Sequence, residues 1–196
     1  MTTSSSIGPP LADGFSLVHP LDEFYARSGR PLPPLNELPG HAVPEPYKTL
    51  LVHQNDMTPT LEQFHGRSIH LQLLGRRRDE NTYFREVILQ LDGTDQPVEF
   101  GAIRINLSLF TPVAREQILE ERLPLGHILE EFKIPHTSRP RAYLRLASDN
   151  LINEVLKLSG AHVLYGRRNT LFDPRDLPLA EIVEILPVTV HPQLGP

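Results

Sequence analysis

An arginine inside an apolar strand pattern is the residue of this sequence that most plainly indicates chemistry. In TYFREVILQL (82–91), Arg85 shares one strand face with Val87 and Leu89, because side chains alternate with a period of two. A guanidinium on a covered face must either reach water or meet an anion. We interpret Arg85 as the anchor of an anionic ligand. The alternative is a structural arginine that snorkels to the surface or forms an ion pair there.

Two glutamates near the C-terminus are candidates for proton transfer. Glu181 and Glu184 lie three residues apart in a strand predicted over 177–190, so they point to opposite faces and only one can reach a given cavity. Both faces of this strand are largely apolar, and alternation alone does not choose between the two. A buried carboxyl group with a raised pKa can act as a general acid.

A pair of adjacent arginines forms a second polar cluster. Arg167 and Arg168 follow Gly166 in a strand predicted over 161–173. Neighbouring strand residues point to opposite faces, so one guanidinium should meet the covered side of the sheet, and we assign ligand contact to Arg167. The alternative is a bulge at the glycine with two arginines on the surface.

Metal and cofactor chemistry finds little support. The chain has no cysteine, and its nine histidines include no pair at helical i+3 or i+4 spacing. His53, His65 and His136 are the residues that a metal site would need to bring together as three neutral ligands. There is no phosphate loop, dinucleotide-binding glycine motif or nucleophile elbow. We therefore expect no metal and no cofactor.

The elements that must position these residues alternate between helical and strand patterns. Asp92-Gly93 supplies a tight turn between strands in 82–91 and 97–107, and the strand predicted over 68–80 precedes them. Helices are predicted within 45–66, 111–135 and 148–160, and further strands over 138–148, 161–173 and 177–190. Six strands, neighbours in sequence at each end, predict an α+β fold on a mainly antiparallel sheet.

Composition separates an N-terminal segment from a single domain. Residues 1–46 hold nine of the 20 prolines, which predicts an extended or poorly ordered segment apart from a short helix at 21–29. The compact domain is expected over 47–190. With 39% hydrophobic and 22% charged residues, this length is typical of a globular protein with a core of its own.

Charge and hydropathy limit the possible partners. A net charge of −5 without a sustained basic stretch argues against nucleic-acid binding. The N-terminus lacks the basic and apolar regions of a signal peptide, and no run approaches the roughly 20 apolar residues that cross a bilayer. We expect a soluble cytoplasmic protein with a small-molecule partner and no membrane partner. The sequence leaves the oligomeric state open.

Five segments in order resemble the chorismate lyase family. They are DMT (56–58), YFREVILQLDG (83–93), PLGHIL (124–129), LYGRRNTL (164–171) and AEIVEILP (180–187). The resemblance covers about residues 50–188 and is nearer to a divergent branch of the family than to its ubiquinone-pathway enzyme. It implies a six-stranded antiparallel sheet with helices folded over a buried ligand cavity.

The resemblance also implies a reaction and its residues. The family removes pyruvate from chorismate to leave 4-hydroxybenzoate, without metal or organic cofactor. Arg85 matches the arginine that holds the ring carboxylate, and Met57 and Leu125 match residues whose backbone amides assist it. The family's last-strand glutamate aligns cleanly with neither candidate here. We favour Glu184 over Glu181, with a bulge adjusting the register.

Two main functions follow. The first is a cofactor-free lyase acting on chorismate or a close relative, with Arg85 as anchor and a last-strand glutamate as acid. The second is a non-catalytic module of the same fold that binds or senses an aromatic carboxylate, since fold does not fix function. An enzyme acting on a different aromatic acid is a third possibility. Pyruvate release from chorismate, as opposed to saturable binding alone, separates the first two.

Overall fold

A single antiparallel sheet organises the molecule. The computed structural model describes residues 14–187, and within them seven strands follow the spatial order β1-β5-β6-β7-β4-β3-β2, each antiparallel to its neighbours. The strands are β1 (Leu35–Leu38), β2 (Ile69–Asp79), β3 (Thr82–Leu91), β4 (Gln96–Asn106), β5 (Thr137–Ala147), β6 (Val163–Phe172) and β7 (Pro178–Leu186).

The central hairpin of β3 and β4 forms as its sequence pattern predicts. Gly93 adopts a φ of 78° in the turn, a backbone region that costs glycine nothing. The register places Arg85 opposite Ile103 and Val87 opposite Gly101. Strand β7 pairs with the other edge of β4, so Ile103 faces Ile182 in turn. Arg85 therefore lies on one of the inner strands of a continuous sheet.

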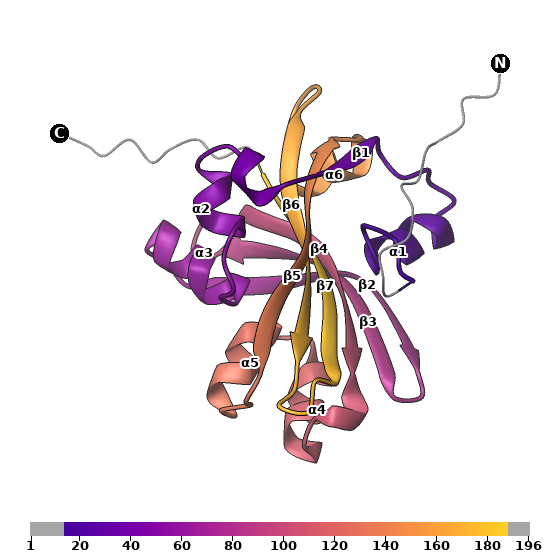
Figure 1. Cartoon of the computed structure of the whole chain (residues 1–196), viewed down its shortest axis with the longest axis vertical. Helices are drawn as coiled ribbons and strands as arrows, with labels where there is room; N and C mark the ends of the chain where they lie inside the picture. The colour runs from indigo at the N-terminus through magenta and orange to yellow at the C-terminus, as the bar shows by residue number, and fades with distance from the viewer. Residues whose placement is uncertain (1–13, 188–196) are drawn as a thin grey trace.

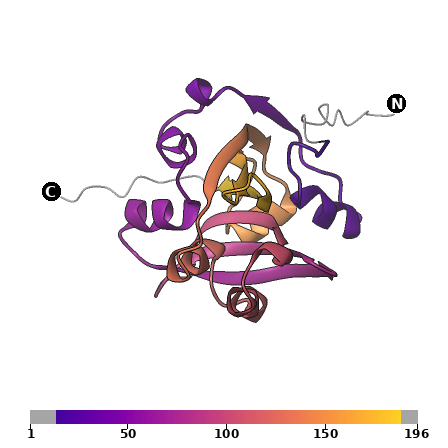
Figure 2. The same cartoon turned by 60° about the horizontal axis from the view of Figure 1, so that its bottom comes forward.

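Helices cover both faces of this sheet. They are α1 (Leu21–Arg27), α2 (Tyr47–Leu51), α3 (Met57–His65), α4 (Pro112–Glu120), α5 (Leu125–Glu131) and α6 (Asn150–Val155), with short 3-10 turns η1 (Gly40–Ala42) and η2 (Leu107–Leu109). In both views α2 and α3 lie on the opposite side of the sheet from α1 (Figures 1 and 2). Helices α1 and α6 pack on one apolar cluster, and α2 to α5 pack on two others.

The predicted α+β class with an antiparallel sheet is confirmed, but the strand number is seven instead of six. The additional strand is β1, a four-residue edge strand that pairs with β5. It lies directly after Pro33 and Pro34 and ends before Pro39, and a strand this short between prolines leaves almost no alternating pattern to read.

Residues 14–46 differ from the separate, extended segment predicted for 1–46. Tyr25 of α1 is only 1% exposed and packs with Phe100 and Ala102 of β4, while β1 extends the sheet. The prolines limit helix length but do not prevent burial of the aromatic and aliphatic side chains between them. Residues 1–13, and the part of the predicted last strand beyond Pro187, lie outside the described residues.

No helix in residues 14–187 is long and apolar enough to span a membrane. The longest, α3 and α4, have nine residues each, whereas a bilayer crossing takes roughly 20.

Candidate functional site

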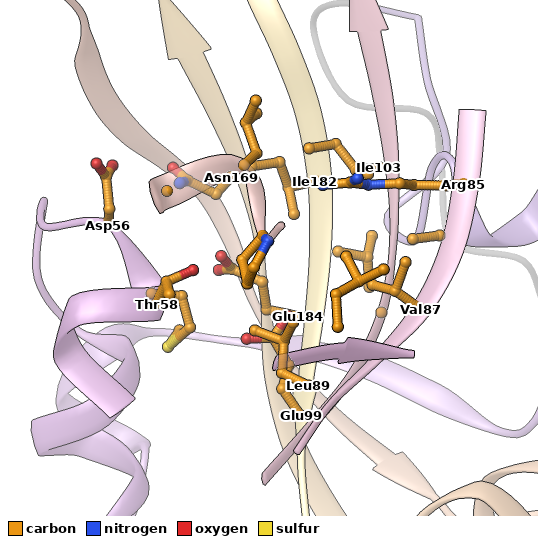
Figure 3. A pocket seen from close by; sticks show the side chains of 18 of the residues that line it. Asp56, Thr58, Arg85, Val87, Leu89, Glu99, Ile103, Asn169, Ile182 and Glu184 are labelled. Carbon is orange, nitrogen blue, oxygen red and sulfur yellow. The ribbon is translucent and has the colours of Figure 1, made fainter. Parts of the chain in front are cut away.

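A cavity lies between the sheet and the helices α3 and α5. Its empty volume is about 560 Å³, part of it open to solvent. The inward side chains of β3, β4, β6 and β7 form its floor, and the first turns of α3 and α5 form its roof. The apolar lining includes Leu71, Val87, Leu89, Ile103, Leu125, Leu129, Leu171 and Ile182. The polar lining includes Asp56, Thr58, Arg85, Glu99, Asn169 and Glu184 (Figure 3).

Helices α3 and α5 are in close contact at their first turns, and this contact closes the roof of the cavity. A Cβ placed on Gly126 of α5 would lie 2.9 Å from Thr58 of α3, inside the distance that real Cβ atoms keep. Only glycine therefore lets the first turn of α5 approach α3 so closely. The sequence segments DMT and PLG meet at this contact and line the same cavity.

Arg85 is a buried guanidinium that lacks a counterion among the described residues. Its side chain is 1% exposed, and its Nη2 donates to the Leu123 carbonyl oxygen at 3.3 Å. Its Nε and Nη1 have no hydrogen-bond partner. Burial lowers the pKa of Arg85 to about 10, which still leaves the group charged at neutral pH. An unpaired buried cation on a cavity wall is the arrangement that an anionic ligand would complete.

The acid that acts electrostatically on Arg85 is already engaged elsewhere. Glu121 accepts hydrogen bonds from the Tyr83 hydroxyl at 2.6 Å and from Arg76 at 2.5 Å. It raises the pKa of Arg85 less than burial lowers it. Figure 3 shows Arg85 extending across the cavity wall toward Ile182, with Asn169 on the far side. In this view the guanidinium ends beside the apolar side chains of Ile103 and Ile182.

The two candidate glutamates lie on opposite faces of β7. Glu184 lines the cavity, whereas Glu181 lies on the other face, where it accepts hydrogen bonds from Arg168 at 3.2 Å and from Thr170 at 2.9 Å. Glu181 is therefore remote from the cavity in the described structure. The alternation of side chains along a strand predicts that these two glutamates point to opposite faces of the sheet. Which of the two faces holds the cavity is determined only by the packing of α3 and α5.

Arg167 lies on the same face of β6 as Asn169 and Leu171, which line the cavity, but it is not itself part of the lining. Its Nε donates to the Glu184 carboxylate, directly across the strand pair. Its other nitrogens donate to backbone carbonyl oxygens of Leu51, His53 and Asn55 at 3.4, 3.2 and 3.1 Å. The side chain is fully buried, as is that of Arg168, which excludes the alternative of two surface arginines. Arg167 joins Glu184 to the segment between α2 and α3.

Met57 and Leu125 both line the cavity, each as the first residue of its helix. The N–H groups of a first helical turn have no partner within the helix. Arg85, Met57, Leu125 and Glu184 are thus brought to one cavity, and Glu181 and Arg167 are not.

Glu99 is a cavity residue that sequence reasoning missed. It is 5% exposed, and its Oε2 has no hydrogen-bond partner. Burial, and secondly the charge of Glu184, raise the pKa of Glu99 well above its usual range. The available signal was an acidic residue between Val98 and Phe100 in a strand, the same type of signal that identified Arg85.

The three candidate histidines lie in separate environments. His53 contacts Arg167, and burial together with that cation lowers its pKa. His136 pairs with Asp56 at 2.9 Å, and burial lowers the pKa of His65. Among residues 14–187, no group of three or more His, Asp or Glu side chains is arranged to hold a metal ion.

Comparisons with known proteins identify the fold. No family model matches the chain, and no curated protein matches it. PhnF from Mycobacterium smegmatis matches with a TM-score of 0.52 at 13% identity, over 70% of this chain and 65% of that one. The chain thus spans about two thirds of the PhnF structure. The effector domain of PhnF alone matches with the same TM-score and identity, over 68% of this chain and 88% of the domain.

A third structure is the ligand-binding domain of a Bordetella bronchiseptica protein described as a GntR-family transcriptional regulator. It matches with a TM-score of 0.45 at 14% identity, over 62% of this chain and 85% of that one. The chorismate lyase-like fold that the sequence segments imply is supported, and the effector domain of PhnF shares it.

The expected lyase activity is wrong. The part of PhnF that shares the fold is described as an effector domain, so the assignments of chorismate, pyruvate and catalysis are corrected. The segments that resemble the lyase family include those that build the sheet and the cavity roof, which sensing proteins of this fold need equally. Glu184, the expected acid, already accepts a hydrogen bond from Arg167.

Proposed function

We propose that this chain is a ligand-binding module that takes up a small organic anion, such as an aromatic carboxylate, in the cavity under α3 and α5. Arg85 is the anchor. Its buried guanidinium carries the proposal, because two of its nitrogens have no partner and the walls around it are otherwise mostly apolar. A planar guanidinium binds a carboxylate through two parallel hydrogen bonds.

The rest of the lining supports a ligand with an apolar body. The branched aliphatic side chains of β3, β4 and β7 cover most of the floor, and pockets of this kind bury an apolar body while a few polar groups set its orientation. The backbone amides of Met57 and Leu125 would add donors to the anion. PhnF's matching part is an effector domain, which is consistent with binding and not turnover as the role of this cavity.

The nucleic-acid partner is a separate matter. The net charge of −5 argues against a nucleic-acid partner for this chain. Regulators such as the Bordetella protein nevertheless act on transcription, so the absence of a nucleic-acid partner stays a prediction.

Calorimetric titration with matched acids and amides tests the anion site. We expect 4-hydroxybenzoate, 3-hydroxybenzoate or 4-methylbenzoate to bind, and the corresponding uncharged amides to bind roughly 30-fold or more weakly. Arg85→Met should remove this preference, and Arg85→Lys should restore only part of it, because an ammonium lacks the two-point geometry. Arg104→Met, on the opposite face of β4, is the control. Equal affinity for acid and amide, or an unaffected Arg85→Met variant, would refute the proposal.

A further inference from the structure

Besides Arg85, the cavity is lined by a second buried ionisable side chain that has a polar atom without a hydrogen-bond partner. Glu99 of β4 is buried, its Oε2 meets no donor, and it lines the same cavity. The register separates it from Arg85: Ile103 lies opposite Arg85, and Glu99 is four residues away from Ile103 along the same strand. Four residues of an antiparallel strand span about 13 Å. The two groups therefore define different ends of the cavity.

The surroundings of Glu99 hold one cation for two acids. Glu184 of β7 is the nearby acid, and Arg167 of β6 is the cation that acts on both. The residue opposite Glu99 on β3 is Leu89, which is apolar. Helix α3 lines the cavity with Met57 and with its N-cap Asp56, and the Asp56 carboxylate is paired with His136. His53, from the segment after α2, lies beside Arg167. A single cation leaves one carboxyl of the pair uncompensated.

Arg167 does not line the cavity, and its donors are already engaged. It is held by Glu184 on one side and by the carbonyl oxygens of three residues in 51–55 on the other. The groups that this end of the cavity offers to a ligand are therefore carboxyl oxygens. Burial, and secondly the charge of Glu184, raise the pKa of Glu99 well above its usual range, which favours the protonated form of this carboxyl group.

We propose that the ligand is amphoteric, with its anionic group on Arg85 and a protonated amine on Glu99 and Glu184. This inference rests on the anion site proposed above and specifies the other end of its ligand. As the ammonium enters, the Glu99 carboxylic acid releases its proton to solvent and its carboxylate accepts N–H hydrogen bonds from the ligand. The O–H bond of Glu99 is the only covalent bond that breaks, and the proton leaves as solvated H⁺.

A matched series of benzoates tests this assignment. The probes are 4-methylbenzoate, 4-(hydroxymethyl)benzoate, 4-(aminomethyl)benzoate and the 3-(aminomethyl) isomer, which samples a second spacing between the two ends. We expect one aminomethyl isomer to bind about tenfold or more tightly than the hydroxymethyl compound. Titrations at pH 7 in buffers of different ionisation enthalpy should show release of about one proton with the amine only.

Glu99→Gln identifies the residue responsible. Glutamine has the shape of the neutral acid, so the variant should fold. It should bring the amine and hydroxymethyl affinities within about twofold of each other and abolish proton release. Glu86→Gln is the matched control, because Glu86 is a β3 carboxyl with a raised pKa that is not part of the cavity lining. It should retain both effects.

The outcomes separate this inference from the anion site. If the hydroxymethyl compound binds as tightly as both amines, or if the amine's advantage survives Glu99→Gln, the amine assignment is refuted while Arg85-dependent binding of 4-methylbenzoate stands. If none of the four probes binds, or binding does not depend on Arg85, the anion site and the amine assignment are refuted together.

Discussion

Arg167 and Glu184 lie opposite each other on β6 and β7, and the guanidinium that holds the carboxylate also holds three backbone carbonyl groups of residues 51–55. One side chain thus connects a cavity-lining acid to the segment that leads into α3. Because α3 forms the roof, the position of the roof depends on this buried pair. We therefore expect a substitution at Glu184 to alter the stability of the roof, and a change in the roof to alter the environment of Glu184.

A double-mutant cycle measures this connection. Arg167→Met leaves Glu184 buried without its partner and should lower the free energy of unfolding by about 3–5 kcal/mol. Glu184→Gln should cost less, and the double variant should cost less than the sum of the two. Urea denaturation provides the energies, and amide exchange should accelerate at residues 52–56 in Arg167→Met. Additive losses with unchanged exchange would contradict the connection.

Arg85→Met should stabilise the unliganded protein while removing anion binding. Burial lowers the pKa of Arg85 to about 10, which corresponds to a cost on the order of 3 kcal/mol for keeping the cation buried. Replacing even a buried ion pair by apolar side chains of similar volume is often neutral or stabilising, by up to about 4 kcal/mol, and within residues 14–187 Arg85 has no counterion whose attraction would be lost. Thermal and urea unfolding measure the change. A clear loss of stability would show that Arg85 has a structural role.

Arg85 is the part of the site that the sequence predicts well. Its assignment needs only the two-residue period of a strand and the cost of burying a guanidinium. The Asp92-Gly93 turn and the α+β class follow from equally local rules. The opposite orientation of Glu181 and Glu184 is also local, since it depends on strand parity alone.

The remaining features depend on contacts distant in sequence. Arg167 belongs to a strand pattern, but its partners at 51–55 are more than 100 residues away. The pKa of Glu99 on β4 is raised in part by the charge of Glu184, which lies on the neighbouring strand β7 and is distant in sequence. The lyase expectation fails for a related reason. The matching segments indicate the fold and the presence of a cavity, whereas the chemistry depends on how each side chain in the cavity is paired.

The Asp56–His136 pair should make the stability of the protein depend on pH. The hydrogen bond to Asp56 raises the pKa of His136 above its ordinary value. A raised folded-state pKa gives a stabilisation that is fully present below the unfolded pKa of about 6.5 and is lost as pH rises through the folded value. Urea titrations from pH 5.5 to 8.5 should show this loss, and His136→Gln should flatten it. A raised pKa in an NMR titration of His136 is the direct measurement.

The last prediction concerns Tyr25 and the segment before residue 47. Tyr25 is buried against β4 and donates through its hydroxyl to Asp149 at 2.8 Å, and Asp149 caps α6 by accepting from the Ile152 N–H. One side chain therefore connects the N-terminal segment to both the sheet and α6. Tyr25→Ala should lower the free energy of unfolding by about 3–5 kcal/mol, the range for loss of a buried aromatic ring.

Tyr25→Phe separates packing from the hydrogen bond and should cost only about 0.5–1.5 kcal/mol. Removing residues 1–46 should destabilise the protein more than Tyr25→Ala, because it also removes Leu17, Val18 and Leu21 from the same cluster and β1 from the sheet. Removing residues 1–13 is the matched control for a shortened chain. If the 47–196 fragment melts at the temperature of the full chain, the domain begins at residue 47, as proline density alone suggests.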